Sequence, residues 1–340
     1  MGAAGVDKWL YPTDRGLYCE PGGFFVDPGR AVDRAIVTHG HSDHARPGHG
    51  AVLATGETIE IMKTRMGPEC AGALEPLAYG AAQSINGVGV RLAPAGHILG
   101  AAQVVIDWNG QRAVISGDYK RAADPTCPTF EVVPCDVFVT EATFALPVFR
   151  HEPAESEVAR LLASIARQPE RAHLVGAYGL GKTQRVIRLA RQAGYDKPIY
   201  LHGALVELCA LYQRLGVDLG DLRAATTGKS EDFAGALVLC PPSAVDDRWS
   251  RRFPDPVTAF ASGWMRIKGR IRQSGVELPL VISDHADWPE LLDTIVETGA
   301  EDVWVTHGRE DALVYWCRQQ GLEAEPLRIV AYEEDGEDED

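Results

Sequence analysis

The sequence predicts an α/β fold in which a β-rich domain is interrupted by an inserted α/β block. Between residues 16 and 140, short apolar segments are separated by turn-forming residues, which is typical of strands. From Glu155 to Phe260, helical periodicity alternates with short strands. From Leu278 the short-strand pattern returns, so we expect the first domain to resume there.

Several of the expected strands in the first part lead directly into polar side chains. Gly16–Val26 predicts two short strands around Pro21-Gly22-Gly23, leading into Asp27. Ala35–Thr38 predicts a strand that ends at a histidine-rich turn. Further strands are expected at residues 88–92, 101–108, 113–116 and 136–140, with Asn109-Gly110 as the tight turn between the second and third of these.

The later segments divide the chain into domains. Helices are expected at residues 155–167, 183–193 and 289–297, and strands at 174–175, 199–202, 236–239, 257–260, 280–283 and 303–306. We therefore predict a first domain at 1–147 that resumes at 278–332, an inserted α/β domain at 148–277, and a disordered acidic tail at 333–340.

Composition narrows the class of protein. The 340 residues are 45% hydrophobic and 24% charged, which is ordinary for a globular protein. No apolar run approaches the ~20 residues that span a bilayer, and the N-terminus lacks the pattern of an export signal. We expect a cytoplasmic protein without a membrane partner. Because the seven cysteines are scattered and never spaced as CxxC, any metal must be held by histidine and carboxylate.

The formal net charge of −15 is unevenly distributed. Ala331–Asp340 holds seven acids and no base, which is typical of a solvated tail. Residues 150–273 hold 19 Lys and Arg against 13 Asp and Glu, so this segment carries +6 and the remainder −21. A basic middle segment suits contact with a nucleic-acid backbone, although a merely solvated surface explains the charge equally well.

The strongest chemical signal is the turn His39-Gly-His41-Ser-Asp43-His44. Four metal-competent side chains within six residues are too costly to bury unless a metal or another partner pairs them. At the end of a strand, His39 and His41 can face one metal while Asp43 and His44 face a second. Imidazole and carboxylate without thiolate suit Zn²⁺ or Mn²⁺ in an open catalytic site.

Two further polar residues follow in the order that such a site requires. His97 lies in the glycine-flanked loop Ala95-Gly96-His97-Ile98-Leu99-Gly100. Asp118 follows the apolar strand that ends at Ser116-Gly117, and a carboxylate at a strand end is well placed to bridge two cations.

The ordered set Asp27, His39-x-His41-x-Asp43-His44, His97, Asp118 resembles the metallo-β-lactamase superfamily. The resemblance implies the αββα metallo-β-lactamase sandwich and two divalent metal ions, with Zn²⁺ favoured and Mn²⁺ as the alternative. It implies that Asp27 orients ligands. It assigns one metal to His39, His41 and His97, the other to Asp43, His44 and a late histidine, and bridging to Asp118.

Three motifs in the second half resemble motifs A, B and C of the β-CASP group of nucleases. They are Thr140-Glu141-Ala142-Thr143-Phe144, Ser283-Asp284-His285-Ala286-Asp287 and Val305-Thr306-His307-Gly308. The group carries an insertion between motifs A and B, where this chain has its basic α/β block. The resemblance implies His307 as the last ligand of the second metal, and His285, held by Glu141, as the proton donor to the leaving oxygen.

Length and motif spelling most resemble the bacterial exonucleases associated with DNA ligase and helicase repair clusters. They imply a single-strand DNA exonuclease in DNA repair that leaves a 5′-phosphate and a 3′-hydroxyl, with a ligase and a helicase as partners. His307, where the DNA enzymes usually carry valine, favours an RNA-processing ribonuclease instead. We favour DNA.

Gly176-Ala-Tyr-Gly-Leu-Gly181-Lys182-Thr183 matches the phosphate-binding loop of ATPases. The block around it has no convincing acidic partner strand for Mg²⁺, so the ATPase remains a distant alternative. A glycine-rich loop and a helix N-terminus can instead cradle a nucleic-acid phosphate. With the basic and aromatic residues near Trp264, the candidate nucleic-acid ligands are Lys182, Arg185, Arg266, Lys268 and Arg270.

Overall fold

The computed structural model describes residues 5–225 and 233–327, so the predicted acidic tail at 333–340 lies outside the described residues. The chain divides into two compact units: unit 1 comprises residues 1–148 and 285–340, and unit 2 comprises residues 149–284. The expected domains at 1–147 and 148–277 meet near the first of these boundaries. The second boundary falls seven residues later than expected.

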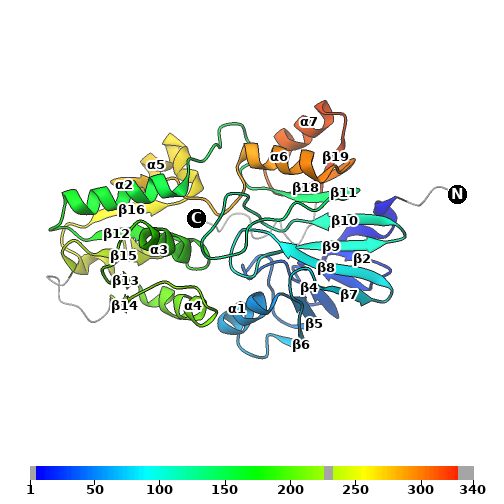
Figure 1. Ribbon diagram of the computed structural model, residues 1–340, viewed down its shortest axis with the longest axis horizontal. Coiled ribbons are helices and arrows are strands. Elements are labelled where there is room, and N and C mark those ends of the chain that lie inside the picture. Colours follow the sequence, from blue (N-terminus) through cyan, green and yellow to red (C-terminus); the bar gives the residue numbers. More distant parts are fainter. Residues whose placement is uncertain (1–4, 226–232, 328–340) are drawn as a thin grey trace. The chain divides into compact units, whose positions relative to one another are not determined.

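Unit 1 contains two sheets (Figure 1). The first has the order β1-β2-β3-β4-β5-β6, and the second β19-β18-β11-β10-β9-β8-β7. The strands of the first sheet are β1 Leu10–Thr13, β2 Gly16–Cys19, β3 Phe24–Val26, β4 Arg34–Ile36, β5 His49–Ala54 and β6 Ala71–Pro76. Those of the second are β7 Ala82–Ile85, β8 Val88–Pro94, β9 Ala102–Trp108, β10 Gln111–Ile115, β11 Val137–Ala142, β18 Asp302–Gly308 and β19 Glu323–Pro326.

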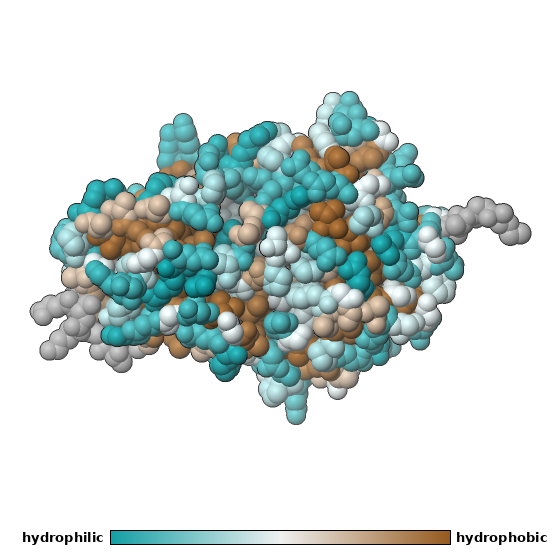
Figure 2. Space-filling view, viewed as in Figure 1, coloured by the Kyte–Doolittle hydropathy of each residue, from teal (hydrophilic) through white to brown (hydrophobic). Residues whose placement is uncertain are grey.

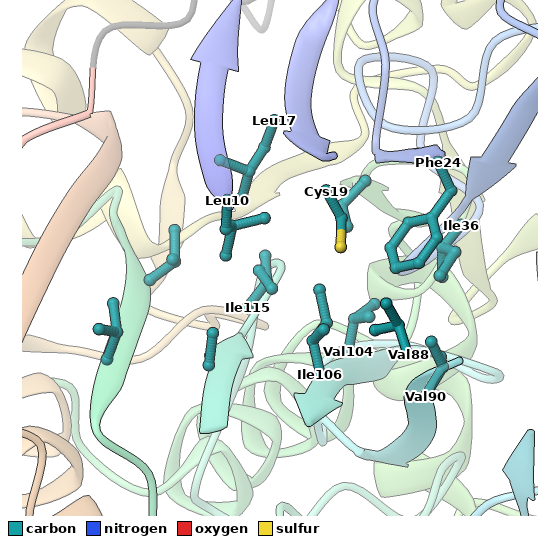
Figure 3. Packing of buried hydrophobic residues seen from close by; sticks show 14 of the residues in the cluster. Leu10, Leu17, Cys19, Phe24, Ile36, Val88, Val90, Val104, Ile106 and Ile115 are labelled. Carbon is teal, nitrogen blue, oxygen red and sulfur yellow. The ribbon is translucent and has the colours of Figure 1, made fainter. Parts of the chain in front are cut away.

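The inner faces of the two sheets form the main core of unit 1. Figure 3 shows side chains of the first sheet opposite side chains of the second across a shared apolar layer. Complete burial of such a side chain contributes about 1.5–3 kcal/mol to stability. The labelled residues are Leu10, Leu17, Cys19, Phe24 and Ile36 of the first sheet and Val88, Val90, Val104, Ile106 and Ile115 of the second.

Alternation along β4 and β5 explains how helix α1 Gly56–Met66 covers the outer face of the first sheet. Ile36 and Leu53 belong to the core between the sheets, whereas Ala35 and Val52 pack on the other face with Met62 of α1. Helices α6 Trp288–Thr298 and α7 Glu310–Gln319 contact strands β11, β18 and β19 of the second sheet. Each sheet therefore has one face on the shared core and helices in contact with it.

The sequence prediction of a tight turn at Asn109-Gly110 is confirmed. Trp108 pairs with Gln111, and the two central residues have φ of 50° and 76°. Positive φ at both positions is the geometry that favours Asn-Gly in a two-residue hairpin. The turn closes the β9–β10 hairpin, and β10 then leads into Gly117 and Asp118.

Unit 2 contains one parallel sheet of order β14-β13-β15-β12-β16-β17. Its strands are β12 His173–Gly176, β13 Ile199–Leu201, β14 Leu222–Ala224, β15 Leu237–Cys240, β16 Val257–Ala261 and β17 Leu278–Leu280. Its helices are α2 Ala154–Arg167, α3 Lys182–Gln192, α4 Gly203–Arg214 and α5 Lys268–Ser274. Among the described residues, α3 lies between β12 and β13, α4 between β13 and β14, and α5 between β16 and β17, since parallel pairing requires crossover connections.

Pairing of β17 explains the later domain boundary. The sequence predicts a strand at 280–283 that belongs to the resumed first domain. Instead the strand is Leu278–Leu280, and it pairs in parallel with β16 of unit 2. A short apolar segment does not encode which sheet edge it joins, so this choice belongs to the tertiary structure.

Within the described part of the chain, none of the helices is long and apolar enough to cross a membrane.

Candidate metal centre

The first group of potential metal ligands brings together His39, His41, His97 and Asp118, in unit 1. His41 Nδ1 lies 3.1 Å from both His39 Nε2 and His97 Nε2. Asp118 Oδ2 lies 3.4 Å from His39 Nε2 and 3.8 Å from His97 Nε2. Ligand atoms around a tetrahedral zinc ion are roughly 3.3 Å apart, given Zn–N bonds of about 2.0–2.1 Å. The four atoms therefore have the spacing of a first coordination shell.

The second group comprises Asp43, His44 and His307. His44 Nε2 lies 3.4 Å from Asp43 Oδ2 and 3.5 Å from the same Asp118 Oδ2 that faces the first group. One carboxylate oxygen is therefore shared between the two groups. This is the geometry expected of a carboxylate that bridges two cations.

A β-bulge sets the position of His307. Along the β11–β18 pair, Glu141 is opposite Thr306 and Ala142 is opposite Gly308, so His307 is the extra residue. Its φ is 51°, in the left-handed region that few residues other than glycine adopt. Bulges often re-aim a side chain next to an active site, and here the bulge accompanies the placement of His307 beside His44.

Asp27 orients His44, one of the histidines of the second group. Its Oδ2 accepts a hydrogen bond from His44 Nδ1 at 2.7 Å, which leaves His44 Nε2 directed at the ligand cluster. The Thr38 backbone N–H and hydroxyl donate to the same carboxylate at 2.8 and 2.6 Å. A carboxylate that accepts a hydrogen bond from one ring nitrogen of a histidine orients the ring and increases the basicity of the other nitrogen toward a metal.

Thr38 also sets the tautomer of His39. The Thr38 hydroxyl has one proton, which it donates to Asp27. Its 3.0 Å contact with His39 Nδ1 must therefore be a hydrogen bond donated by the imidazole. The lone pair of His39 then lies on Nε2, the atom that faces His41 and Asp118. This role of Thr38 was not predicted from the sequence, and the only signal for it is its position directly before the histidine motif.

Several histidines of the cluster are held neutral. Burial and the neighbouring His44 lower the pKa of His39 to about 4. Burial and repulsion from the surrounding histidines, first among them His285, lower the pKa of His97 well below its usual value. Burial and repulsion from His44 also lower the pKa of His307. Neutral imidazole is the form that binds a metal.

His44 differs because carboxylates surround it. Burial alone would lower the pKa of His44, but Asp43, Asp118 and Asp27 hold it well above its usual value. Burial would raise the pKa of Asp118, but His44 and His39 hold it well below its usual value. Three carboxylates around one ring are an excess of negative charge that a divalent cation would neutralise.

The residues fit divalent metal ions. All ligand candidates are imidazoles or carboxylates, which suit Zn²⁺ or Mn²⁺. The buried Asp43 Oδ1 has no hydrogen-bond partner among the described residues, and a buried carboxylate oxygen requires a donor or a cation. We infer that the two groups hold two metal ions that share Asp118.

His285 lies beside this cluster, also in unit 1. Its Nδ1 is 2.9 Å from Glu141 Oε2, and its ring centroid is 4.6 Å from that of His97. Glu141 is buried, and its other oxygen accepts a hydrogen bond from the backbone N–H of Tyr119 at 2.7 Å. Burial raises the pKa of Glu141, and the adjacent His285 opposes that rise. The imidazole is thus held by Glu141 through Nδ1.

Gly96 is required for the loop that carries His97. Its φ is 73°, and a Cβ added there would lie 2.2 Å from Lys120 O and 3.0 Å from Phe130 N, both backbone atoms. We expect Gly96→Ala to lower the free energy of unfolding by about 3 kcal/mol, the sum of left-handed strain and overpacking. Gly110→Ala is the control, because Gly110 has φ of 76° with nothing within 4 Å. Urea denaturation of both variants tests the difference, and equal losses would contradict it.

Lys182 and Arg185 in unit 2, two of the predicted nucleic-acid ligands, are both buried and paired. Lys182 is 5% exposed, and its Nζ lies 2.5 Å from Asp284 Oδ1. Arg185 is 3% exposed and donates to the carbonyl of Ser283 at 2.5 Å. Because buried cations require partners, both side chains are committed to the 283–284 segment.

Side chains of the ATPase-like loop form hydrogen bonds with the backbone of the same loop. Gln184 accepts a hydrogen bond from Gly181 N at 2.8 Å and donates one to Gly179 O at 2.9 Å. Thr183 donates its hydroxyl proton to Tyr178 O at 2.7 Å. A phosphate-binding loop needs these groups for phosphate and Mg²⁺. The arrangement therefore disfavours the ATPase interpretation.

We expect Lys182→Met to lower the free energy of unfolding by about 3–5 kcal/mol, because the buried Asp284 carboxylate loses this cation. Thermal denaturation beside Lys197→Met, which changes an exposed lysine of the same unit, measures the effect. We also expect the wild-type protein to hydrolyse no ATP. Nucleotide turnover that depends on Lys182 would contradict this prediction.

The other three predicted nucleic-acid ligands lie on the surface of unit 2. Arg266, Lys268 and Arg270 are exposed, on or beside α5, and the Arg270 guanidinium lies 5.5 Å from the centroid of the Trp264 ring. Figure 2 shows a projecting hydrophilic surface at the place of α5. No acid occurs between residues 263 and 276. The segment is a cationic patch with an aromatic ring on an acidic chain.

Comparison with known proteins finds relatives along most of the chain. No family model matches the chain. The chain is 27% identical, over 93% of its length, to 31% of a probable DNA ligase of Opitutus terrae. It is 22% identical, over 91% of its length, to 52% of an endoribonuclease of Eremothecium gossypii. It is 27% identical, over 92% of its length, to 89% of a ribonuclease of Thermus thermophilus.

The chain thus spans only a third to a half of the first two relatives. Among solved structures, it is similar to a protein of unknown function from Enterococcus faecalis, with a TM-score of 0.57 and 13% identity, over 82% of this chain and 76% of that one. That likeness concerns the fold. With the two ligand groups and the three later motifs, these relatives are consistent with the β-CASP family of metallo-β-lactamase nucleases, which the chain resembles.

Proposed function

We propose that this protein is a two-metal-dependent phosphodiesterase that cuts nucleic acid, with single-stranded DNA as the favoured substrate and an exonuclease mode. The observation that carries the proposal is the pair of ligand groups that share Asp118, with His285 held beside them by Glu141. In this proposal unit 1 is the αββα metallo-β-lactamase domain and unit 2 is the β-CASP domain. The two sheets of unit 1, with their shared core and the helices in contact with them, support that layer order.

Each side chain of the cluster has a role in hydrolysis. Bound divalent ions, with Zn²⁺ favoured over Mn²⁺, would supply Lewis-acid stabilisation of the phosphoryl oxygens and an activated water. His39, His41 and His97 would hold one ion, Asp43, His44 and His307 the other, and Asp118 both. Asp27 orients His44.

His285 would deliver a proton to the 3′-oxygen as the bond between phosphorus and that oxygen breaks. Glu141 accepts the hydrogen bond from Nδ1, so the proton transferred is the one on Nε2. Glu141 also stabilises the cationic form of the ring before transfer. The products are a 5′-phosphate and a 3′-hydroxyl.

DNA is favoured because a segment similar to 93% of this chain forms 31% of a longer relative named as a probable DNA ligase. Because that relative combines such a segment with a ligase name in one protein, we propose that this chain prepares DNA ends for a ligase in DNA repair, with a helicase as a further partner. The relatives named as ribonucleases favour RNA as the second candidate. The same ligand groups serve both substrates, because the chemistry occurs at the phosphodiester.

A nuclease assay tests the proposal. Protein loaded with Zn²⁺ or with Mn²⁺ is given single-stranded DNA and RNA of matched sequence, labelled at either end, beside His41→Ala. We expect digestion of DNA from one end, absent in the variant. Cleavage of RNA alone would replace the DNA assignment, and cleavage of neither by metal-loaded protein would overturn the proposed function.

The surface patch on α5 is proposed to bind the nucleic-acid backbone. Each cation that neutralises a phosphate changes the slope of log affinity against log salt by about one. We therefore expect Lys268→Ala/Arg270→Ala to reduce that slope by about two, measured by fluorescence anisotropy. Arg91→Ala/Arg112→Ala, which removes two ion-paired arginines of unit 1, is the control. An unchanged slope in the α5 variant would show that this patch does not contact the backbone.

A further inference from the structure

Three loops that carry the proposed active-site residues meet at the segment that follows Asp118. The backbone N–H of Lys120 donates to Ala95 O at 3.0 Å, two residues before His97. The carbonyl of Tyr119 accepts from Ala286 N at 2.6 Å, one residue after His285. Residues 119–120 therefore connect the loops of His97, Asp118 and His285, all within unit 1.

An ion pair between the buried Lys120 and the partly exposed Glu290 joins the same segment to helix α6. Lys120 Nζ lies 2.6 Å from Glu290 Oε2, and the side chains are 6% and 18% exposed. The same carboxylate accepts from Ala122 N at 2.8 Å through Oε1 and from Asp287 N at 3.1 Å through Oε2. Glu290 thus ties residues 120–122 to the first turn of α6, which begins three residues after His285.

A second ion pair between the same elements lies on the surface. Arg121 NH2 is 2.8 Å from Glu297 Oε2, with side chains 24% and 48% exposed. Exposed pairs of this kind contribute little and restrain little. A buried pair is often no more stabilising than apolar residues of the same size, so its presence here calls for another role.

The distance between Asp118 and His285 is restrained at two points. At the metal centre, Glu141 accepts from Tyr119 N at 2.7 Å and from His285 Nδ1 at 2.9 Å. Away from the centre, the Lys120–Glu290 pair holds the two chain segments that lead out of it. Without the second restraint, the distance between Asp118 and His285 is set only by Glu141 and by the Ala286–Tyr119 hydrogen bond.

We propose that Lys120 and Glu290 are positioning residues that set the distance from His285 to the metal centre. The inference rests on the proposed function, in which His285 protonates the leaving oxygen. A misplacement of about 1 Å can cost roughly 100-fold in rate, because proton transfer requires contact. A substrate whose leaving group needs no proton does not depend on this distance.

The test compares two substrates and four variants. Lys120→Met, Glu290→Gln and the double variant Lys120→Met/Glu290→Gln remove the ion pair, and Arg121→Met removes the surface pair as the control. The double variant leaves neither charge without its partner, so a loss of activity in it is not explained by unfolding around an unpaired charge. Each protein, with its bound metal quantified, is assayed on the oligonucleotide and on bis(p-nitrophenyl) phosphate, whose leaving group is a weak base.

We expect kcat on the oligonucleotide to fall about 10- to 100-fold in the ion-pair variants, with KM within threefold, metal content unchanged and nitrophenyl hydrolysis retained. Arg121→Met should match the wild type. Equal losses on both substrates, or wild-type kcat in the double variant, would overturn the positioning role alone. A wild-type protein that cleaves neither substrate would overturn the proposed function, and the positioning role with it.

Discussion

Asp118→Ala should lower kcat for phosphodiester hydrolysis by at least about 10³-fold, the factor that corresponds to roughly 4 kcal/mol of transition-state stabilisation. Asp118 Oδ2 is the atom that faces both ligand groups, at 3.4 Å from His39 Nε2 and 3.5 Å from His44 Nε2. In the proposed centre, its loss would remove a shared ligand and also the negative charge that favours two cations at close range. Each group then has to hold its ion without the bridge.

Metal analysis distinguishes this effect from a loss of folding. We expect the variant to retain fewer than two ions per chain after dialysis, with a Tm close to that of the metal-free wild type. Asp107→Ala, at an exposed carboxylate paired with Arg112, should keep both ions and full activity. Retention of two ions and of turnover by Asp118→Ala would refute the bridging assignment.

His285→Ala should lower kcat on the oligonucleotide by about 10²- to 10⁴-fold, the usual contribution of a general acid. The imidazole is placed by Glu141 at 2.9 Å and lies against the ring of His97. Because His285 is not required by either of the two ligand groups that share Asp118, both ions should remain bound. The loss should therefore appear in the chemical step and not in metal content.

The leaving group decides whether the role is proton transfer. Hydrolysis of bis(p-nitrophenyl) phosphate should fall less than tenfold in His285→Ala, because nitrophenolate departs without a proton. Glu141→Gln should give an intermediate loss on the oligonucleotide. His202→Ala, which changes a half-buried helix-capping histidine of unit 2, is the control. Loss of metal from His285→Ala would instead assign this histidine to the metal shell.

The ligand candidates could be predicted because their spacing is local or ordered along the chain. Four of them lie within six residues, and the turn after β4 places His39 beside His41 and Asp43 beside His44. His97 and Asp118 follow strands whose pairing is encoded by alternation and by the Asn109-Gly110 turn.

Some elements were not anticipated because their residues do not favour them. The edge strands β6 Ala71–Pro76 and β19 Glu323–Pro326 contain proline, glutamate and alanine, which are poor strand formers. Each exists because a neighbouring strand offers an unpaired edge, β5 for the first and β18 for the second. Local propensity cannot report such an edge.

The type of chemistry could be predicted from the residues alone, since a cluster of imidazoles and carboxylates at strand ends has few physical explanations other than metal ions. Which cations are available to a ligand depends instead on the folded arrangement of the chain. Lys182 matches the phosphate-loop motif, yet its side chain is buried and paired with Asp284, about one hundred residues away in the sequence. Lys120 and Glu290 are 170 residues apart, and no local pattern marks them as a pair. Pairing across such distances depends on which surfaces the fold brings together, and burial then turns a common ion pair into a restraint.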